Sequence, residues 1–183
     1  LSIEDLDDKA IESAEILYME GYLWDRPTSK EAFLHAAKLN KLSGGKNAIT
    51  LSDVFCVEMH RDSFIEFIKD SIDFVFCNEE EIMALSLKET TEDAFEYFEK
   101  EFPDLEELVC TLGPNGAVVI SKGEKVHYEA GEAEVIDKTG AGDYFAAGYL
   151  YGLQKKLTIE ESADIANRSA ADVISEVGVR PTE

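Results

Sequence analysis

The residues from Asp137 to Asp143 (DKTGAGD) combine types that suit anion binding and proton transfer. Gly140 and Gly142 let the backbone turn sharply and approach a ligand closely. The helix-like run Tyr144–Leu150 follows at once, so its free N–H groups and positive dipole end point back at the turn. An anion is expected to bind at this turn, and the Asp143 carboxylate beside it suits a general base better than a binding group. A tight loop entering a helix, with Asp143 stabilising only the helix dipole, is the simpler alternative.

Asn78 and Glu81 follow the apolar run Ile72–Cys77 with N-x-x-E spacing. If that run is a parallel strand, both residues lie at its carboxyl end, where open α/β sheets collect their ligands. Asn followed three residues later by Glu is also an ordinary capping box at the start of a helix. The two interpretations are compatible.

A third glycine-bearing segment is Thr111-Leu112-Gly113-Pro114-Asn115-Gly116. A turn between two strands would explain its glycines and its proline equally well. The G-x-x-x-x-G-K-[ST] loop and the G-x-G-x-x-G fingerprint, which mark two large classes of nucleotide-binding proteins, are both absent from the sequence.

Together these segments resemble the PfkB/ribokinase family of sugar and nucleoside kinases, whose signature reads D-T-x-G-A-G-D. Lys138 fills a position that is often Thr or Ser. The resemblance implies that the backbone of Gly140, Ala141 and Gly142 forms the anion hole for the transferred phosphoryl group. It also implies that Asp143 takes the proton from the acceptor hydroxyl.

The same resemblance implies cofactor sites. Asn78 and Glu81 match the family's N-x-x-E motif, which helps hold Mg²⁺ and phosphate through water, and Glu81 is the expected metal-side residue. Asp137 matches the residue that binds a monovalent cation such as K⁺ in some members, together with carbonyl groups after the last helix.

ATP is the nucleotide that the resemblance implies. Thr111 and Gly113 match the T-x-G-x-x-G segment and are expected to approach the phosphates or the ribose, while Gly116 lets the chain turn. Asn167 corresponds to a position that flanks the adenine; alone it would pass for an exposed helix residue.

Strand-like and helix-like segments alternate through the first 112 residues, which predicts βαβ units and a parallel sheet covered on both faces. Thr28 and Glu31 are expected to cap one helix. The expected helices cover Ile3–Ser13, Thr28 to about Gly44, Asp62–Lys69, Glu79–Leu87 and Thr91–Phe102, and the expected strands cover Ala14–Leu23, Asn47–Leu51, Ile72–Cys77 and Leu105–Leu112.

After Gly113 the pattern predicts a hairpin and then two helices. The hairpin joins Ala117–Ser121 to Lys125–Ala130 through a glycine-bearing turn. The helices cover Ala141–Lys155 and Ile159–Val177, the second begun by a capping box of Thr158 and Glu161. The fold class expected from the resemblance is a ribokinase-like three-layer α/β/α fold with a mainly parallel central sheet.

Composition excludes several partners. The 183 residues carry 17 Lys and Arg against 39 Asp and Glu, a net charge of −22. Such a surface repels nucleic acids and anionic membranes, so neither is an expected partner, and a cytoplasmic protein is expected. Cys56, Cys77 and Cys110 are odd in number and lack C-x-x-C spacing, so we expect reduced, buried side chains.

The expected function is ATP-dependent phosphoryl transfer to a hydroxymethyl group of a sugar or nucleoside. The chain looks most like bacterial adenosine-kinase-like members in three segments, Glu20–Asp25, Asp53–Cys56 and His60–Asp62.

The resemblance covers residues 1–183 as one domain but only the C-terminal portion of the family fold. The Gly-Gly substrate motif and the small β lid, through which members can form a homodimer, are not matched. The chain is therefore expected to be a truncated product, incomplete at its N-terminal side and inactive alone. The alternative is a non-catalytic nucleotide-binding fragment or interaction module.

Overall fold

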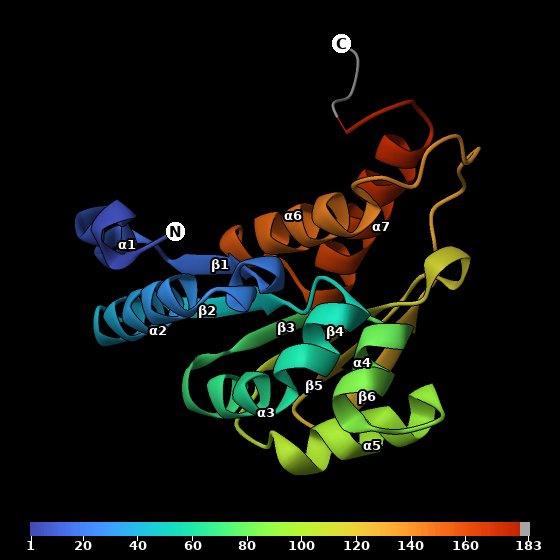
Figure 1. Ribbon diagram of the computed structural model, residues 1–183. Coiled ribbons are helices and arrows are strands. Elements are labelled where there is room, and N and C mark those ends of the chain that lie inside the picture. The colour runs from blue at the N-terminus through green and yellow to red at the C-terminus, as the bar shows by residue number, and fades with distance from the viewer. Residues whose placement is uncertain (180–183) are drawn as a thin grey trace. The chain divides into compact units, whose positions relative to one another are not determined.

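The computed structural model describes residues 1–179. Six strands form one sheet in the order β1-β2-β3-β4-β5-β6. The pairs β1/β2 and β2/β3 are parallel, with Ile16 opposite Lys46 and Ala48 opposite Phe74. Helices alternate with these strands along the chain (Figure 1), as the sequence predicts. The expectation of an α/β protein with a mainly parallel sheet is confirmed.

The chain divides into two compact units, which are described separately. The first unit comprises residues 1–110 and 120–124, and the second comprises residues 111–119 and those from 125 onward. In the first, the elements are η1 (Ile3–Asp5), α1 (Asp8–Ser13), β1 (Ile16–Glu20), η2 (Gly21–Asp25), α2 (Pro27–Leu42), β2 (Lys46–Thr50), α3 (Val54–Ser71), β3 (Phe74–Asn78), α4 (Glu79–Ser86), α5 (Thr91–Glu101) and β4 (Glu107–Thr111), whose last residue falls in the second unit.

Three helices of the first unit differ from the expectation. The single helix expected over Ile3–Ser13 is wrong, because Leu6 is extended and separates η1 from α1. The capping box predicted for Thr28 and Glu31 is wrong, because α2 begins one residue earlier, with Pro27 at its first turn and Arg26 at the N-cap. Proline suits that position because its fixed φ is helical and its missing N–H would have had no partner.

Helix α3 begins at Val54 rather than Asp62, is capped by Asp53, and is kinked at His60.

The core of the first unit is organised around Trp24, which is 1% exposed. Its ring centroid lies 4.6 Å from that of Phe67 and 5.3 Å from that of Phe64. The indole Nε1–H donates to Ser63 Oγ at 2.8 Å, so the one polar group of the ring is satisfied. This aromatic cluster holds α3, which carries both phenylalanines, against η2, which carries Trp24.

The cysteine expectation is confirmed: Cys56, Cys77 and Cys110 are free and buried. Burial raises the pKa of the Cys77 thiol well above its ordinary value. None of the helices in residues 1–179 is long and apolar enough to cross a membrane.

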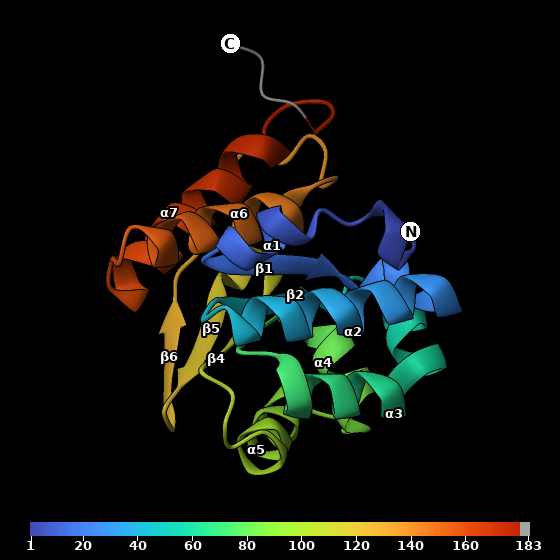
Figure 2. The same cartoon turned by 90° about the vertical axis from the view of Figure 1, so that its left-hand side faces the viewer.

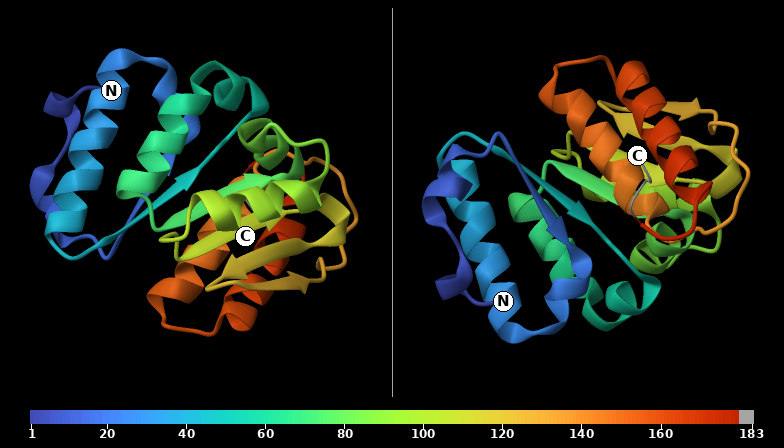
Figure 3. Two further views of the ribbon diagram at one scale, coloured as in Figure 1. Left: turned by 90° about the horizontal axis from the view of Figure 1, so that it is seen from below. Right: turned by 90° about the horizontal axis from the view of Figure 1, so that it is seen from above.

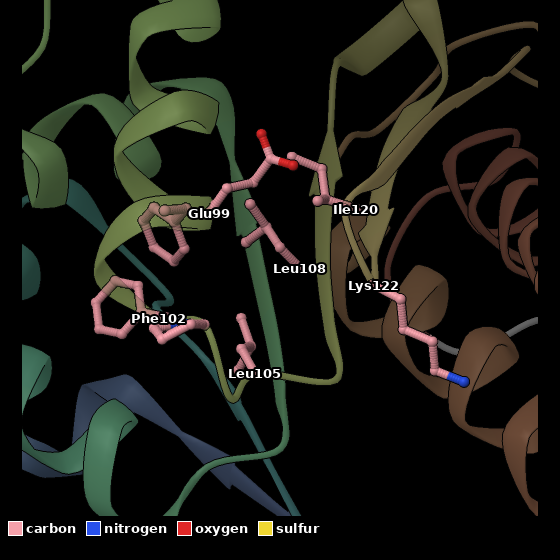
Figure 4. Close-up of a pocket in the computed structure, with 9 residues that line it drawn as sticks. Glu99, Phe102, Leu105, Leu108, Ile120 and Lys122 are labelled. Atoms are coloured by element: carbon pink, nitrogen blue, oxygen red, sulfur yellow. The ribbon is translucent and has the colours of Figure 1, made fainter.

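A small cavity of about 140 Å³ lies in the first unit between α5 and the sheet (Figure 4). Its walls are mainly apolar, with Phe102, Leu105, Leu108 and Ile120 among them. The Lys122 side chain extends away from Leu105 and Leu108. The cavity therefore holds no cluster of groups that could carry chemistry.

The second unit contains η3 (Gly113–Asn115), most of the hairpin strands β5 (Ala117–Ser121) and β6 (Glu124–Tyr128), and the helices α6 (Ala141–Gln154) and α7 (Ile159–Ile174). The predicted hairpin is confirmed. Its two-residue connection, Lys122 and Gly123, has φ of 52° and 78°. Two positive φ values are the geometry of the tight turn that joins antiparallel strands.

Helices α6 and α7 lie side by side in every view (Figures 2 and 3). Two glycines of α6 make this approach possible, because a Cβ on Gly148 would stand 2.9 Å from Ala166 Cα and one on Gly152 would stand 2.3 Å from Ser162 Oγ. The predicted capping box of Thr158 and Glu161 starts α7. The two helices pack closely. The first turn of α6 and the second half of α7 contribute residues to the candidate site.

Candidate functional site

The loop that precedes α6 is held by the Asp137 carboxylate. Asp137 Oδ1 accepts hydrogen bonds from the backbone N–H of Thr139 at 2.9 Å and from its hydroxyl at 2.6 Å. Asp137 Oδ2 accepts one from the Gly178 N–H at 3.1 Å. These bonds, the Thr139 hydroxyl first, lower the pKa of Asp137 below its ordinary value. An ionised Asp137 therefore ties the loop to the segment after α7.

Gly140 is the N-cap residue of α6 and has φ of +83°. This left-handed conformation favours glycine, and no side chain within residues 1–179 caps the helix. The Ala141 N–H donates to Lys138 O at 3.2 Å, and the Tyr144 N–H donates to Gly140 O at 2.9 Å. The N–H groups of Gly142 and Asp143 lie between these two, in the first turn, where a helix offers no acceptor of its own. Their geometry suits an anion.

The turn between β4 and β5 carries Thr111, Gly113 and Gly116. Gly116 has φ of +86°, and a Cβ on it would stand 2.0 Å from Tyr128 O, so the chain passes where only a glycine fits. The Leu112 N–H donates to Gly116 O at 2.7 Å and closes the turn.

Asn167 lies on α7 and is 8% exposed. Its Nδ2 group donates to Glu129 O at 2.9 Å and so holds the segment after β6 against the helix. A Cβ on Gly131 in that segment would stand 3.2 Å from Ala171 Cβ. Asn167 is therefore a buried positioning group as well as a lining residue, and not the exposed helix residue that it could have been.

The loop before α6, the turn after β4 and the helix that carries Asn167 line one cavity of about 320 Å³. This cavity lies wholly within the second unit. Four segments of the second unit line it: the turn after β4, the segment after β6, the loop with the first turn of α6, and α7. The lining residues are Thr111, Gly113, Pro114, Gly116, Ala130, Gly131, Ala133, Val135, Lys138, Ala141, Gly142, Phe145, Asn167, Ala170, Ala171 and Ile174. Gly140 and Asp143 flank the lining residues Ala141 and Gly142, and Asp143 is exposed.

Sequence reasoning missed the part of this lining that the irregular segment 130–135 supplies. Its residues Ala130, Gly131, Ala133 and Val135 are small or apolar and follow no helix or strand spacing. The nearest signal is Gly131, whose lack of a side chain allows the close approach to α7. Apolar walls with a few polar groups are typical of small-molecule sites.

Asn78 and Glu81 belong to the first unit, where they form the capping box of α4. The Glu81 N–H donates to Asn78 Oδ1 at 2.9 Å, and Glu81 accepts from the Asn78 N–H at 3.1 Å and from Nδ2 at 2.7 Å. Glu81 is 5% exposed. Burial raises the pKa of Glu81 to about 7; the charge of Asp53 adds to this effect and the hydrogen bond from the Asn78 N–H opposes it.

Several solved structures similar to this chain are kinases. The adenosine kinase from Sinorhizobium meliloti is 38% identical, with a TM-score of 0.94 over 99% of this chain and 55% of its own. A probable sugar kinase from Rhizobium etli CFN 42 is 34% identical, with a TM-score of 0.95 over 100% of this chain and 55% of its own. A candidate ribokinase II from E. coli, solved with ATP and Mg²⁺, is 24% identical, with a TM-score of 0.87 over 97% of this chain and 58% of its own.

The last of these likenesses shows the fold, and the expected ribokinase-like three-layer architecture is confirmed. The chain spans about half the length of the proteins that it matches along nearly all of its own length. The family model of the pfkB carbohydrate kinases matches residues 2–183. The chain therefore belongs to the pfkB family of carbohydrate kinases.

Proposed function

We propose that residues 1–183 carry the nucleotide site of a phosphotransferase that moves the γ-phosphoryl group of ATP to a hydroxymethyl group of a sugar or nucleoside. The observation that carries the proposal is the cavity of the second unit. It brings Thr111, Gly113 and Gly116 together with Gly142 and Asn167, which lie far apart in the sequence. Because the chain spans about half of its relatives, the acceptor site is expected from the rest of a complete enzyme.

The start of α6, Asp143 and Asn167 have different proposed roles in phosphoryl transfer. The N–H groups of Gly142 and Asp143, which have no intrahelical acceptor in the first turn of α6, hold the transferred phosphoryl oxygens with the backbone of Gly140 and Ala141. Asp143 stands in the same turn and is exposed to an incoming hydroxyl, so its carboxylate accepts the hydroxyl proton. Asn167 fixes the wall on which the base of the nucleotide rests.

Mg²⁺ fits the residues present only as an ion that keeps water and phosphate oxygens as ligands. No group of three His, Cys, Asp or Glu side chains in residues 1–179 is placed to hold a metal by itself. Mg²⁺ accepts that arrangement because it gives up its water reluctantly and is often held by one or two carboxylates plus substrate phosphates. Glu81 is the carboxylate proposed for this role, with Asn78 fixing its orientation. When bound, the ion would neutralise phosphate charge.

Asp137 is the residue proposed for a monovalent cation. Three hydrogen bonds already occupy its two oxygens. A carboxylate has about four acceptor positions, so one remains for a cation. Activity of a complete enzyme measured in potassium against choline salts tests this assignment.

The test of the proposed base is Asp143→Asn in a complete enzyme. Turnover is expected to fall by about 10²–10⁴-fold, because the amide cannot accept the hydroxyl proton. ATP affinity should stay within a few-fold. The control is Asp172→Asn, an exposed aspartate on α7 that removes the same charge outside the cavity lining.

Near-normal turnover of Asp143→Asn would contradict the assigned base. ATP binding without any phosphoryl transfer by the complete unmodified protein would instead favour a non-catalytic nucleotide-binding module. A substrate screen of adenosine and other nucleosides against sugars then names the acceptor. The similarity to the Sinorhizobium meliloti adenosine kinase supports a nucleoside.

A further inference from the structure

Lys138 is the one charged side chain among the residues that line the cavity of the second unit. The sequence around it is acidic: residues 129–143 contain five carboxylates and this single lysine. Those carboxylates are Glu129, Glu132, Glu134, Asp137 and Asp143. A polyphosphate entering the cavity would meet repulsion from this segment unless a cation offsets it.

The position of Lys138 suits that task. Its carbonyl oxygen accepts the hydrogen bond from the Ala141 N–H, which fixes the lysine backbone one turn before the free N–H groups of α6. The residue is exposed, and within residues 1–179 it makes no ion pair. An ammonium group without a carboxylate partner is available to a ligand.

We propose that Lys138 is the phosphate-recognition residue of this cavity and selects nucleoside di- and triphosphates over the uncharged nucleoside. The inference rests on the proposed function, since it assigns the nucleotide to the same cavity. Backbone N–H groups at a helix start contribute partial charge, whereas Lys138 contributes a full positive charge. The preference for phosphorylated ligands should therefore depend on this side chain.

The experiment measures the dissociation constants of ATP, ADP and adenosine for the 183-residue chain, by isothermal titration calorimetry for tight ligands and by NMR chemical-shift titration for weak ones. The variants are Lys138→Thr, Lys138→Arg and the control Lys155→Thr. Lys155 stands at the opposite end of α6, outside the cavity lining, and its loss changes the net charge equally.

We expect Lys138→Thr to weaken ATP and ADP about 10- to 100-fold, the usual effect of losing one charge-assisted hydrogen bond. Adenosine affinity should be unchanged. Lys138→Arg should restore ATP affinity to within a few-fold, and Lys155→Thr should bind all three ligands as the unmodified chain does. The unmodified chain should also lose more ATP affinity on addition of salt than Lys138→Thr does.

Two results would overturn the inference while leaving the proposed function standing. One is ATP affinity unchanged in Lys138→Thr, and the other is an equal loss of ATP and adenosine affinity, which would indicate a change of shape rather than of charge. Failure of the unmodified chain to bind ATP or ADP would overturn the proposed nucleotide site and the inference together.

Discussion

Gly113 and Gly116 belong to the same turn and both have positive φ, yet their surroundings differ. A Cβ on Gly113 would meet nothing within 4 Å, whereas one on Gly116 would stand 2.0 Å from Tyr128 O and 2.7 Å from Ala130 N. The first position needs glycine only for its backbone conformation. The second also needs it for space.

We therefore expect Gly116→Ala to destabilise the protein by about 3 kcal/mol or more, since backbone strain and overpacking add. Gly113→Ala should cost only about 1 kcal/mol. Urea unfolding of both variants checks this order. Equal losses would show that the approach of Tyr128 and Ala130 relaxes at little cost.

Glu81 makes stability depend on pH. Its folded pKa of about 7 lies above the ordinary value of 4.5, so the folded chain binds this proton more tightly than the unfolded chain does. The resulting stabilisation is present below pH 4.5 and is lost as the pH rises toward 7. In the absence of added metal, the loss from this one group is at most roughly 3 kcal/mol.

We expect Glu81→Gln to be about as stable as the unmodified chain near pH 4.5 and more stable above pH 7, because the amide has no proton to lose. Urea unfolding at several pH values measures the difference. Glu96→Gln, an exposed position on α5, serves as the control and should give a difference that does not grow with pH. A constant difference for Glu81→Gln would contradict the raised pKa.

At the scale of elements, the contact of α6 with α7 decides the shape of the cavity wall. Helix propensity alone predicts that Gly152→Ala stabilises α6 by about 1 kcal/mol. The structure predicts the opposite sign, because the added Cβ would stand 2.6 Å from Ser162 Cβ and 2.8 Å from Ser162 Cα. Neither atom is the end of a flexible side chain, so the helices must separate.

The expected loss for Gly152→Ala is about 1–3 kcal/mol. Thermal or urea unfolding measures it, and Ala147→Gly on the exposed side of the same helix gives the size of the propensity term. A gain of stability in Gly152→Ala would mean that the pair of helices is less tightly packed than the structure indicates.

Several elements could be predicted from the sequence because local signals and packing agree. The capping boxes at Asn78 and Thr158 start α4 and α7, and Gly123 marks the hairpin. At α2 two local signals competed, and Pro27 at the first turn decided the boundary over Thr28. The early start of α3 could not be predicted, because a kink at His60 interrupts the periodicity of the helix.

The candidate site was predictable only in part. The positions of Thr111, Gly142 and Asn167 around one cavity match what the family signature leads one to expect, and their roles stay predictions. The wall formed by segment 130–135 could not be anticipated. Its place depends on a side-chain hydrogen bond from Asn167 to Glu129 O, a contact across 38 residues that no local pattern encodes.

For the whole molecule the dominant feature is charge. With 39 acidic against 17 basic residues, the folded chain brings like charges together and repels itself. Salt screens this repulsion. Raising NaCl from 20 to 500 mM, which shortens the screening length about fivefold, is expected to raise the melting temperature by roughly 3–8 °C.

Differential scanning calorimetry measures the shift, with choline chloride as the control for specific binding of sodium. Both salts should act alike if screening is the cause. A melting temperature that falls with salt would show that attractive ion pairs, such as Lys46 with Asp73 and Glu106, outweigh the general repulsion.

The hydrogen bond from the Gly178 N–H to Asp137 has a consequence for measurement. This amide lies beyond the end of α7, yet its protection from exchange with solvent depends on a carboxylate in the loop that opens α6. Any ligand that orders or displaces that loop should change the exchange rate at Gly178. The amide thus serves as a built-in reporter of occupancy that needs no attached probe and no turnover.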